Sequence, residues 1–122
     1  MSSLLRVYSY SRCGSCRKAI DWLKKNNLEY QLIEILETPP TEELLRQAAN
    51  SFGSIKPLFN TSGRSYRELG ASFVRSLSDD EAINAIVKDP KLIKRPFLVK
   101  GESCFLIGFK IEDWIQFLLN EN

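Results

Sequence analysis

The chain begins with a strand pattern that changes into a helix pattern. Leu5, Val7 and Tyr8 are β-branched or bulky apolar residues, which suit a half-buried strand. After them, positions at i, i+3, i+4 and i+7 spacing fall on one helical face, namely Cys16, Ala19, Ile20, Leu23 and Asn27. The pattern predicts a first strand and then a helix over about residues 14–26.

A second strand follows the first helix closely. Residues 29–35 alternate loosely between polar and apolar side chains, as a strand does. A strand, a helix and a strand within ~30 residues form a βαβ unit, so the two strands are expected to be parallel neighbours. Pro39 and Pro40 then end the unit, because proline interrupts regular structure.

The middle of the chain has helical patterns broken into short pieces. Thr41 is a suitable N-cap for a helix over 42–50, and Ser78-Asp79-Asp80-Glu81 is a capping-box sequence. The helix after this box is expected to have an apolar face formed by Ala82, Ile83, Ile86 and Val87. A short helix is also expected over 65–69.

The end of the chain predicts a β-hairpin and a last helix. Residues 97–99 and 104–107 are strand-like and are separated by a turn at Gly101. The last helix has the clearest amphipathic pattern, with apolar positions at Ile111, Trp114, Ile115, Leu118 and Leu119. Cys104 lies in an apolar strand and is expected to be a buried, unreactive thiol.

The order of these elements defines the expected fold class. It is α/β, with a thioredoxin/glutaredoxin-like mixed four-stranded sheet (β-α-β … β-β-α) and a helical insertion between the second and third strands. We expect residues 1–122 to form a single domain, because this length suits one hydrophobic core. The thioredoxin-like core would comprise about 4–36 and 95–120, and the insertion about 41–94.

Candidate chemistry lies between the first strand and the first helix, in Cys13-Gly14-Ser15-Cys16. A Cys-x-x-Cys at such a junction is typical of thiol redox sites. Free backbone N–H groups, the helix dipole and the nearby Arg12 and Arg17 favour the thiolate form of Cys13. Cys16 follows one turn later on the same side, where it can attack a mixed disulfide formed at Cys13.

Two other interpretations of the cysteines are less favoured. A zinc site needs about four ligands, whereas the chain has three cysteines and no histidine, so no metal is predicted. Burial as small apolar side chains would suit Cys16, but not Cys13 between Arg12 and Gly14. Without histidine, charge and helix geometry must activate any nucleophile.

Charge and composition restrict the partners and the compartment. The formal net charge of +2 is too small to predict direct binding to nucleic acid or to an anionic membrane. The chain shows neither a signal-peptide pattern nor an apolar run of ~18 residues. Together with the odd number of cysteines, this predicts a cytoplasmic location.

A second candidate constellation is Arg95-Pro96, which opens the third strand. In a thioredoxin-like layout the start of this strand lies beside the Cys-x-x-Cys turn, and a cis proline there would bring the backbone close to the sulfurs. Arg95 offers a fork of donors for an oxyanion or a thiolate; it is equally well interpreted as an exposed cation beside Lys94. Arg64 and Arg67 are expected to be surface charges.

Four stretches form a wider pattern: Cys13-Gly-Ser-Cys-Arg-Lys-Ala, Leu58-Phe-Asn-Thr-Ser-Gly-Arg-Ser-Tyr-Arg-Glu-Leu-Gly70, Leu92-Ile-Lys-Arg-Pro96 and Ile107-Gly-Phe109. In this order they resemble the ArsC/Spx family, over essentially the whole chain. That family includes glutathione/glutaredoxin-type arsenate reductases, Spx transcriptional regulators and other ArsC-like proteins.

The resemblance implies a thioredoxin-like fold and a nucleophilic cysteine, which matches Cys13. In the arsenate reductases this cysteine attacks arsenate, arginines bind the oxyanion, and glutathione resolves the adduct; Arg95 matches one of these arginines. The other two fall at Asn60 and near Gly108. Losing two charged contacts of ~1.5–3 kcal/mol each is expected to weaken oxyanion binding more than about a hundredfold, unless Arg64 or Arg67 replaces them.

Two functions are therefore predicted. The first is a small cytoplasmic thiol oxidoreductase with Cys13 as nucleophile, Cys16 as resolving thiol and Arg95 as stabiliser of the anion or thiolate. It would have no bound cofactor and would take electrons from glutathione, a glutaredoxin or a thioredoxin. The remaining substrate- or thiol-binding candidates are Ser11, Arg12, Gly14, Arg17, Asn60 and Pro96. The alternative is an Spx-like regulator that binds RNA polymerase through a protein interface, with Cys13–Cys16 as a disulfide switch.

Overall fold

The computed structural model describes residues 4–119. Its strands are β1 (Leu5–Ser9), β2 (Gln31–Glu34), β3 (Phe97–Lys100) and β4 (Cys104–Ile107). Its α-helices are α1 (Gly14–Lys25), α2 (Glu42–Phe52), α3 (Arg64–Leu69), α4 (Ala71–Ser76), α5 (Asp79–Lys88) and α6 (Ile111–Leu118). Two short 3-10 helices, η1 (Lys56–Leu58) and η2 (Pro90–Leu92), complete the described elements.

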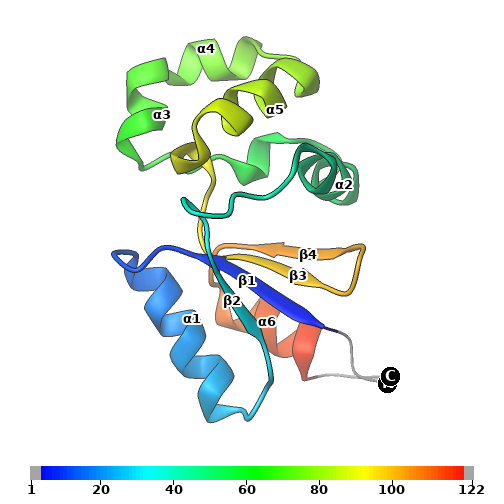
Figure 1. Ribbon diagram of the computed structural model, residues 1–122. Helices are drawn as coiled ribbons and strands as arrows, with labels where there is room; N and C mark the ends of the chain where they lie inside the picture. The colour runs from blue at the N-terminus through cyan, green and yellow to red at the C-terminus, as the bar shows by residue number, and fades with distance from the viewer. Residues whose placement is uncertain (1–3, 120–122) are drawn as a thin grey trace.

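The sheet has the predicted mixed topology. Its four strands lie in the order β2-β1-β3-β4, with β1 parallel to β2 and antiparallel to β3, and with β4 antiparallel to β3. Helices α1 and α6 cover one face, and the helices between β2 and β3 lie over the other (Figure 1). The prediction of a thioredoxin/glutaredoxin-like α/β fold with a helical insertion is thus confirmed.

The two faces of the sheet have separate cores, because successive strand residues point to opposite sides. On the α1/α6 face, the buried side chains are Leu5, Val7, Ala19, Leu23, Leu98, Trp114 and Leu118. On the other face, Tyr8, Phe97, Val99 and Phe105 pack with insertion residues that include Leu45 and Ile83. The second face of the sheet and the insertion therefore share one core. That residues 1–122 form a single domain remains a prediction.

The predicted helix starts in the insertion are confirmed at atomic detail. Thr41 Oγ1 accepts the backbone N–H of Leu44 at 3.1 Å. Ser78 and Glu81 form the reciprocal capping box that the sequence predicted. These caps satisfy backbone N–H groups that have no partner within their own helix.

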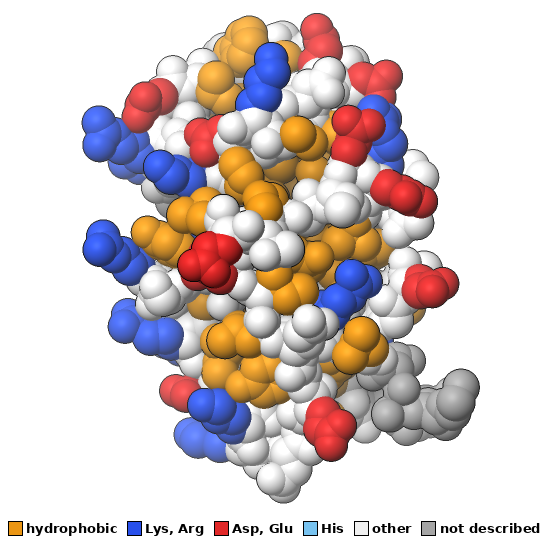
Figure 2. Space-filling model, in the orientation of Figure 1, with side chains coloured by type: hydrophobic (Ala, Val, Ile, Leu, Met, Phe, Trp, Pro, Cys, Tyr) orange, Lys and Arg blue, Asp and Glu red, His pale blue; other side chains and the backbone are white. Residues whose placement is uncertain are grey.

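Helix α4 was not predicted, and two apolar patterns are less buried than their spacing suggested. Val87 is 48% exposed; Ile111 and Ile115 in α6 are 44% and 38% exposed, and Leu119, which caps α6, is 42% exposed. Figure 2 shows hydrophobic side chains reaching the surface among charged ones. A short helix packed on one neighbour buries only a narrow stripe, so an apolar residue at the edge of that stripe remains exposed.

The prediction that Cys104 is buried is wrong. Cys104 is exposed, because it is the first residue of the edge strand β4 and pairs with Lys100 at the open end of the sheet. The second strand is also shorter than predicted, covering Gln31–Glu34 only.

Candidate active site

Cys13 is the N-cap residue of α1. Its backbone is extended, with φ −96° and ψ 118°, and its sulfur accepts the backbone N–H of Cys16 at 3.4 Å. Its own N–H donates to the carbonyl oxygen of Tyr10 at 3.0 Å. The half-buried Cys13 sulfur therefore lies where helix N–H groups and the helix dipole stabilise negative charge.

Cys16 lies in the first turn of α1 and is 1% exposed. Its sulfur accepts the backbone N–H of Tyr10 at 3.4 Å. Burial raises the pKa of the Cys16 thiol to about 12; the Tyr10 N–H opposes this rise, the hydrogen bond and charge of Cys13 add to it, and the charge of Arg95 opposes it. Cys16 is consequently a protonated thiol at neutral pH, directly behind the more accessible Cys13.

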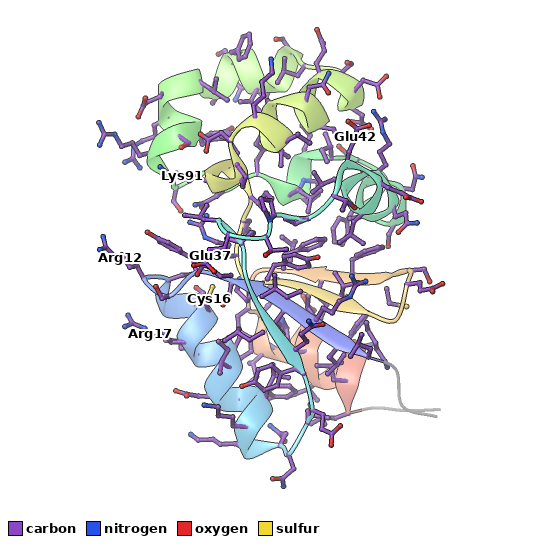
Figure 3. All side chains as sticks on the ribbon, in the orientation of Figure 1. Arg12, Cys16, Arg17, Glu37, Glu42 and Lys91 are labelled. Carbon is purple, nitrogen blue, oxygen red and sulfur yellow. The ribbon has the colours of Figure 1, made fainter. Side chains whose placement is uncertain are left out.

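Four predicted site residues surround the approach to Cys13: Ser11, Arg12, Gly14 and Arg17. All four are exposed, in the turn before α1 or in its first turn. Figure 3 shows Arg12 and Arg17 projecting outward from this end of the helix, whereas Cys16 lies inside. Their positions make them available to a bound partner, and their roles stay predictions.

Arg95 and Pro96 lie next to the cysteine turn, as predicted. The Arg95–Pro96 peptide bond is cis. Tyr8 pairs with Phe97, so continuing this antiparallel register places Arg95 opposite Tyr10. The Arg95 Cζ lies 5.2 Å from the centroid of the Tyr10 ring, and Arg95 is half-buried rather than a free surface cation.

Asn60 lies beside the segment that leads to Arg95. Its N–H donates to the carbonyl oxygen of Leu92 at 2.7 Å, and the neighbouring Phe59 forms a β-bridge with Ile93. The Asn60 side-chain oxygen accepts the hydroxyl of Ser62 at 3.2 Å, within a turn. The backbone thus brings Asn60 toward the site, while its side chain stabilises the local turn.

Arg64, Arg67 and position 108 offer no second cationic arm for binding an oxyanion, because both arginines are engaged elsewhere. Arg64 pairs with Glu68 at 3.0 Å, and Arg67 donates to the carbonyl oxygen of Ser62 at 2.7 Å. Both arginines are exposed on α3, as expected. The side chain of Lys94 fills the space beside Gly108, since a Cβ added there would lie 2.9 Å from Lys94 Cε.

Sequence reasoning missed Tyr10 as a member of this site. Its N–H contacts Cys16, its carbonyl contacts Cys13, and its ring lies under Arg95. The position of Tyr10 just after the first strand was the clue in the sequence. The pairing of that strand with the strand after Arg95 brings Tyr10 and Arg95 together. Without a known register this signal could not be used.

Other features of the described chain lie apart from the cysteines. A groove of about 640 Å³ between α3, α4 and α5 includes Leu69, Phe73 and Leu77 in its lining and none of the predicted site residues. Within residues 4–119, no three His, Cys, Asp or Glu side chains gather as a metal site requires. None of the helices described is long and apolar enough to cross a membrane.

Comparisons with known proteins agree with this geometry. YusI of Bacillus subtilis, an uncharacterised protein, is 41% identical over 108 residues, which cover 87% of this chain and 91% of YusI. The arsenate reductase of Escherichia coli K12 is 32% identical over 98 residues, covering 80% of this chain and 69% of the reductase. The global transcriptional regulator Spx of Streptococcus mutans is 31% identical over 116 residues, covering 94% and 83%.

The solved structures show the same fold. The crystal structure of a possible arsenate reductase from Streptococcus mutans superimposes with a TM-score of 0.83 and 40% identity, covering 92% of this chain and 98% of that one. The sheet topology and the paired thiols at the start of α1 thus define a thioredoxin-like thiol protein. The ArsC family model matches residues 8–117, so the chain belongs to the ArsC family. Its relatives there include both a reductase and a transcriptional regulator.

Proposed function

We propose that this protein is a thiol–disulfide oxidoreductase in which Cys13 is the nucleophile and Cys16 the resolving thiol. One observation carries the proposal: the accessible Cys13 sulfur accepts the Cys16 N–H at the start of α1, with the buried Cys16 sulfur one turn behind it. This arrangement stabilises a thiolate where a substrate can reach it and keeps a second thiol in reserve.

The reaction consists of two thiol–disulfide exchanges. The Cys13 thiolate attacks one sulfur of a substrate disulfide, forms a mixed disulfide, and releases the other sulfur as a thiolate that takes a proton from water. Cys16 then loses its proton to water and attacks the Cys13 sulfur. This step releases the second substrate thiolate and leaves a Cys13–Cys16 disulfide.

The cycle closes when an external thiol supplies two electrons. Two glutathione molecules, or one dithiol of a glutaredoxin or thioredoxin, would reduce the Cys13–Cys16 disulfide and become oxidised to a disulfide themselves. No bound cofactor takes part in these steps. Arg95 would stabilise the developing thiolates by its charge. The same charge lowers the pKa of Cys16, against the larger effect of burial.

The remaining predicted residues would contact the substrate. Ser11, Arg12, Gly14 and Arg17 are exposed around Cys13, and Pro96 precedes β3 beside them. Asn60 would contribute through its position next to the Leu92–Arg95 segment. These are proposed binding roles rather than chemical ones.

Redox titration with single-cysteine variants tests the proposal. The protein is equilibrated in glutathione buffers, free thiols are trapped, and each cysteine is identified by intact mass and peptide mapping. Wild type is expected to form a reversible Cys13–Cys16 disulfide, and Cys16→Ser a glutathione adduct at Cys13. Cys104→Ser is the matched control, because it removes an exposed thiol outside the site. An unreactive Cys13 near neutral pH would contradict the proposal.

A second candidate function is an Spx-like regulator, favoured by the 31% identity to Spx over 94% of this chain. In this case Cys13–Cys16 would be an oxidation switch and RNA polymerase the protein partner. The test is retention of purified RNA polymerase on the immobilised protein, in oxidised and reduced forms. Failure of the oxidised protein to retain the polymerase would count against this candidate.

A further inference from the structure

The donors of Arg95 determine which substrates this site can bind. A guanidinium group carries five N–H bonds, one on Nε and two on each terminal nitrogen. It binds a tetrahedral oxyanion most strongly through two neighbouring donors at once. Such a pair is formed either by Nε with Nη2 or by Nη1 with Nη2.

Both of these donor pairs are compromised in Arg95. Nη1 donates to the carbonyl oxygens of Lys91 and Ile93, at 3.3 Å each. Nε is buried and has no hydrogen-bond partner within the described chain, so a solute cannot reach it. Nη2 is therefore the nitrogen left to a ligand. We call Arg95 a single-ended donor because only this one nitrogen can donate to a bound molecule.

Tyr10 contacts Arg95 from the side of the thiols. Its ring lies under the guanidinium group, 5.2 Å from Cζ, which is within the range of a cation–π contact. Its backbone N–H and carbonyl bond the Cys16 sulfur and the Cys13 N–H. A change to the Tyr10 side chain can therefore remove the ring contact to Arg95 while leaving the backbone contacts to both cysteines in place.

We propose that Tyr10 fixes Arg95 as a single-ended donor beside the thiols, so that the site accepts disulfides and discriminates against tetrahedral oxyanions such as arsenate. The inference rests on the proposed oxidoreductase function and assigns its substrate class. A disulfide presents no oxyanion to be clamped at the reacting sulfur. It requires access to Cys13 and positive charge near the thiolates that form, and a fixed guanidinium supplies that charge.

Substitutions at Tyr10 separate this positioning role from a structural one. Tyr10→Phe keeps the ring, whereas Tyr10→Leu and Tyr10→Met keep an apolar side chain without it. Tyr30→Leu is the matched control, since Tyr30 is also half-buried but packs in the other core. Two assays are made on each variant: the glutathione-dependent reduction of a glutathionylated peptide, and the protection of Cys13 from iodoacetamide by millimolar arsenate or sulfate.

Wild type should reduce the peptide and show little protection by either anion. Tyr10→Leu and Tyr10→Met should reduce it about tenfold more slowly and gain protection by the anions, because the released guanidinium can turn toward them. Tyr10→Phe should keep the wild-type reduction rate and the low protection by anions, and Tyr30→Leu should behave as wild type. The gained protection should disappear when Arg95→Ala is combined with Tyr10→Leu.

Several outcomes would overturn the inference. One is strong protection of wild-type Cys13 by arsenate or sulfate, which would show that Arg95 is available as a clamp. Others are wild-type behaviour of both ring-less variants, or equal losses in Tyr10→Phe and Tyr10→Leu. A wild-type protein that reduces no disulfide would overturn the proposed function itself, and with it this inference. Activity without any dependence on the Tyr10 ring would overturn the inference alone.

Discussion

The thioredoxin-like part carries the candidate reactive side chains, whereas the helical insertion carries capping and packing side chains. In the first part, β1 and α1 place two cysteines at one turn, and the Arg95–Pro96 pair directly before β3 adjoins this turn through Tyr10. In the insertion, short helices are fixed by caps and cover the second face of the sheet. The candidate reactive groups therefore lie on the sheet and its first helix, whereas the insertion covers the second face of the sheet.

The two parts nevertheless meet at the candidate site. The carbonyl oxygens of Lys91 and Ile93, in the last residues of the insertion, accept the hydrogen bonds of Arg95. The Asn60 segment pairs with the same stretch. The end of the insertion therefore helps to position one guanidinium group beside the candidate site.

The largest difference between the two parts should appear in reactivity. Cys13→Ser should lower the rate of thiol–disulfide exchange more than about a hundredfold, because a hydroxyl is a far weaker nucleophile at neutral pH. Initial rates with a glutathionylated peptide measure the effect. Comparable activity of Cys13→Ser and wild type would show that the chemistry lies elsewhere, for example at Cys104.

A core substitution in the insertion tests whether the shared core couples the two parts. Ile83 is 1% exposed in α5, so Ile83→Ala should lower the free energy of unfolding by about 2–5 kcal/mol. Both tryptophans, Trp22 and Trp114, lie in the thioredoxin-like part. Their fluorescence should report the same lowered midpoint as far-UV circular dichroism.

Val87→Ala, in the same helix, is the matched control for Ile83→Ala. Because Val87 is 48% exposed, its truncation should change the free energy of unfolding by less than about 0.5 kcal/mol. An unchanged tryptophan midpoint in Ile83→Ala would mean that the two parts unfold independently.

The raised pKa of Cys16, a residue of the thioredoxin-like part, predicts a pH effect on the stability of the protein. The thiol loses its proton near pH 9 in the unfolded chain but near pH 12 in the folded one, so above about pH 9 the unfolded form binds fewer protons. The free energy of unfolding of the reduced protein should therefore fall as the pH rises from about 9 toward 12.

Chemical denaturation at several alkaline pH values measures this fall, with Cys16→Ala as the comparison. The variant should show a shallower dependence of unfolding free energy on pH, since its residue 16 cannot titrate. Equal slopes for both proteins would mean that Cys16 has no raised pKa in the folded state.

The smallest effect is expected at a helix cap of the insertion. Ser78→Ala removes the side chain that accepts the N–H of Glu81, and should lower the free energy of unfolding by about 0.5–2 kcal/mol. Thiol–disulfide exchange should be unchanged, because the cap lies in the insertion, away from the thiols. Ser103→Ala, in the exposed turn between β3 and β4, is the control and should have no measurable effect on stability.

Much of the fold was predictable because local patterns determined it. The βαβ start, the capping box of α5 and the C-terminal hairpin all follow from residue spacing and capping chemistry. Helix α4 was missed because a single buried residue, Val74, gives no periodic signal. Exposure was mispredicted at Val87 and Cys104, where the neighbouring elements, rather than the local pattern, decide what is covered.

For this protein, the sequence by itself determined the order of the elements and predicted the candidate reactive groups. Cys13 and Cys16 were predicted as the reactive pair from their types and spacing, since helix starts are local properties, and Arg95 was matched to a site arginine by the family resemblance. The tertiary structure decided which groups touch. Only the β1–β3 register places Tyr10 under Arg95, whereas the bonds of Arg95 to the Lys91 and Ile93 carbonyls form within its own segment. Tyr10 and Arg95 are far apart in sequence, so no local pattern encodes their contact.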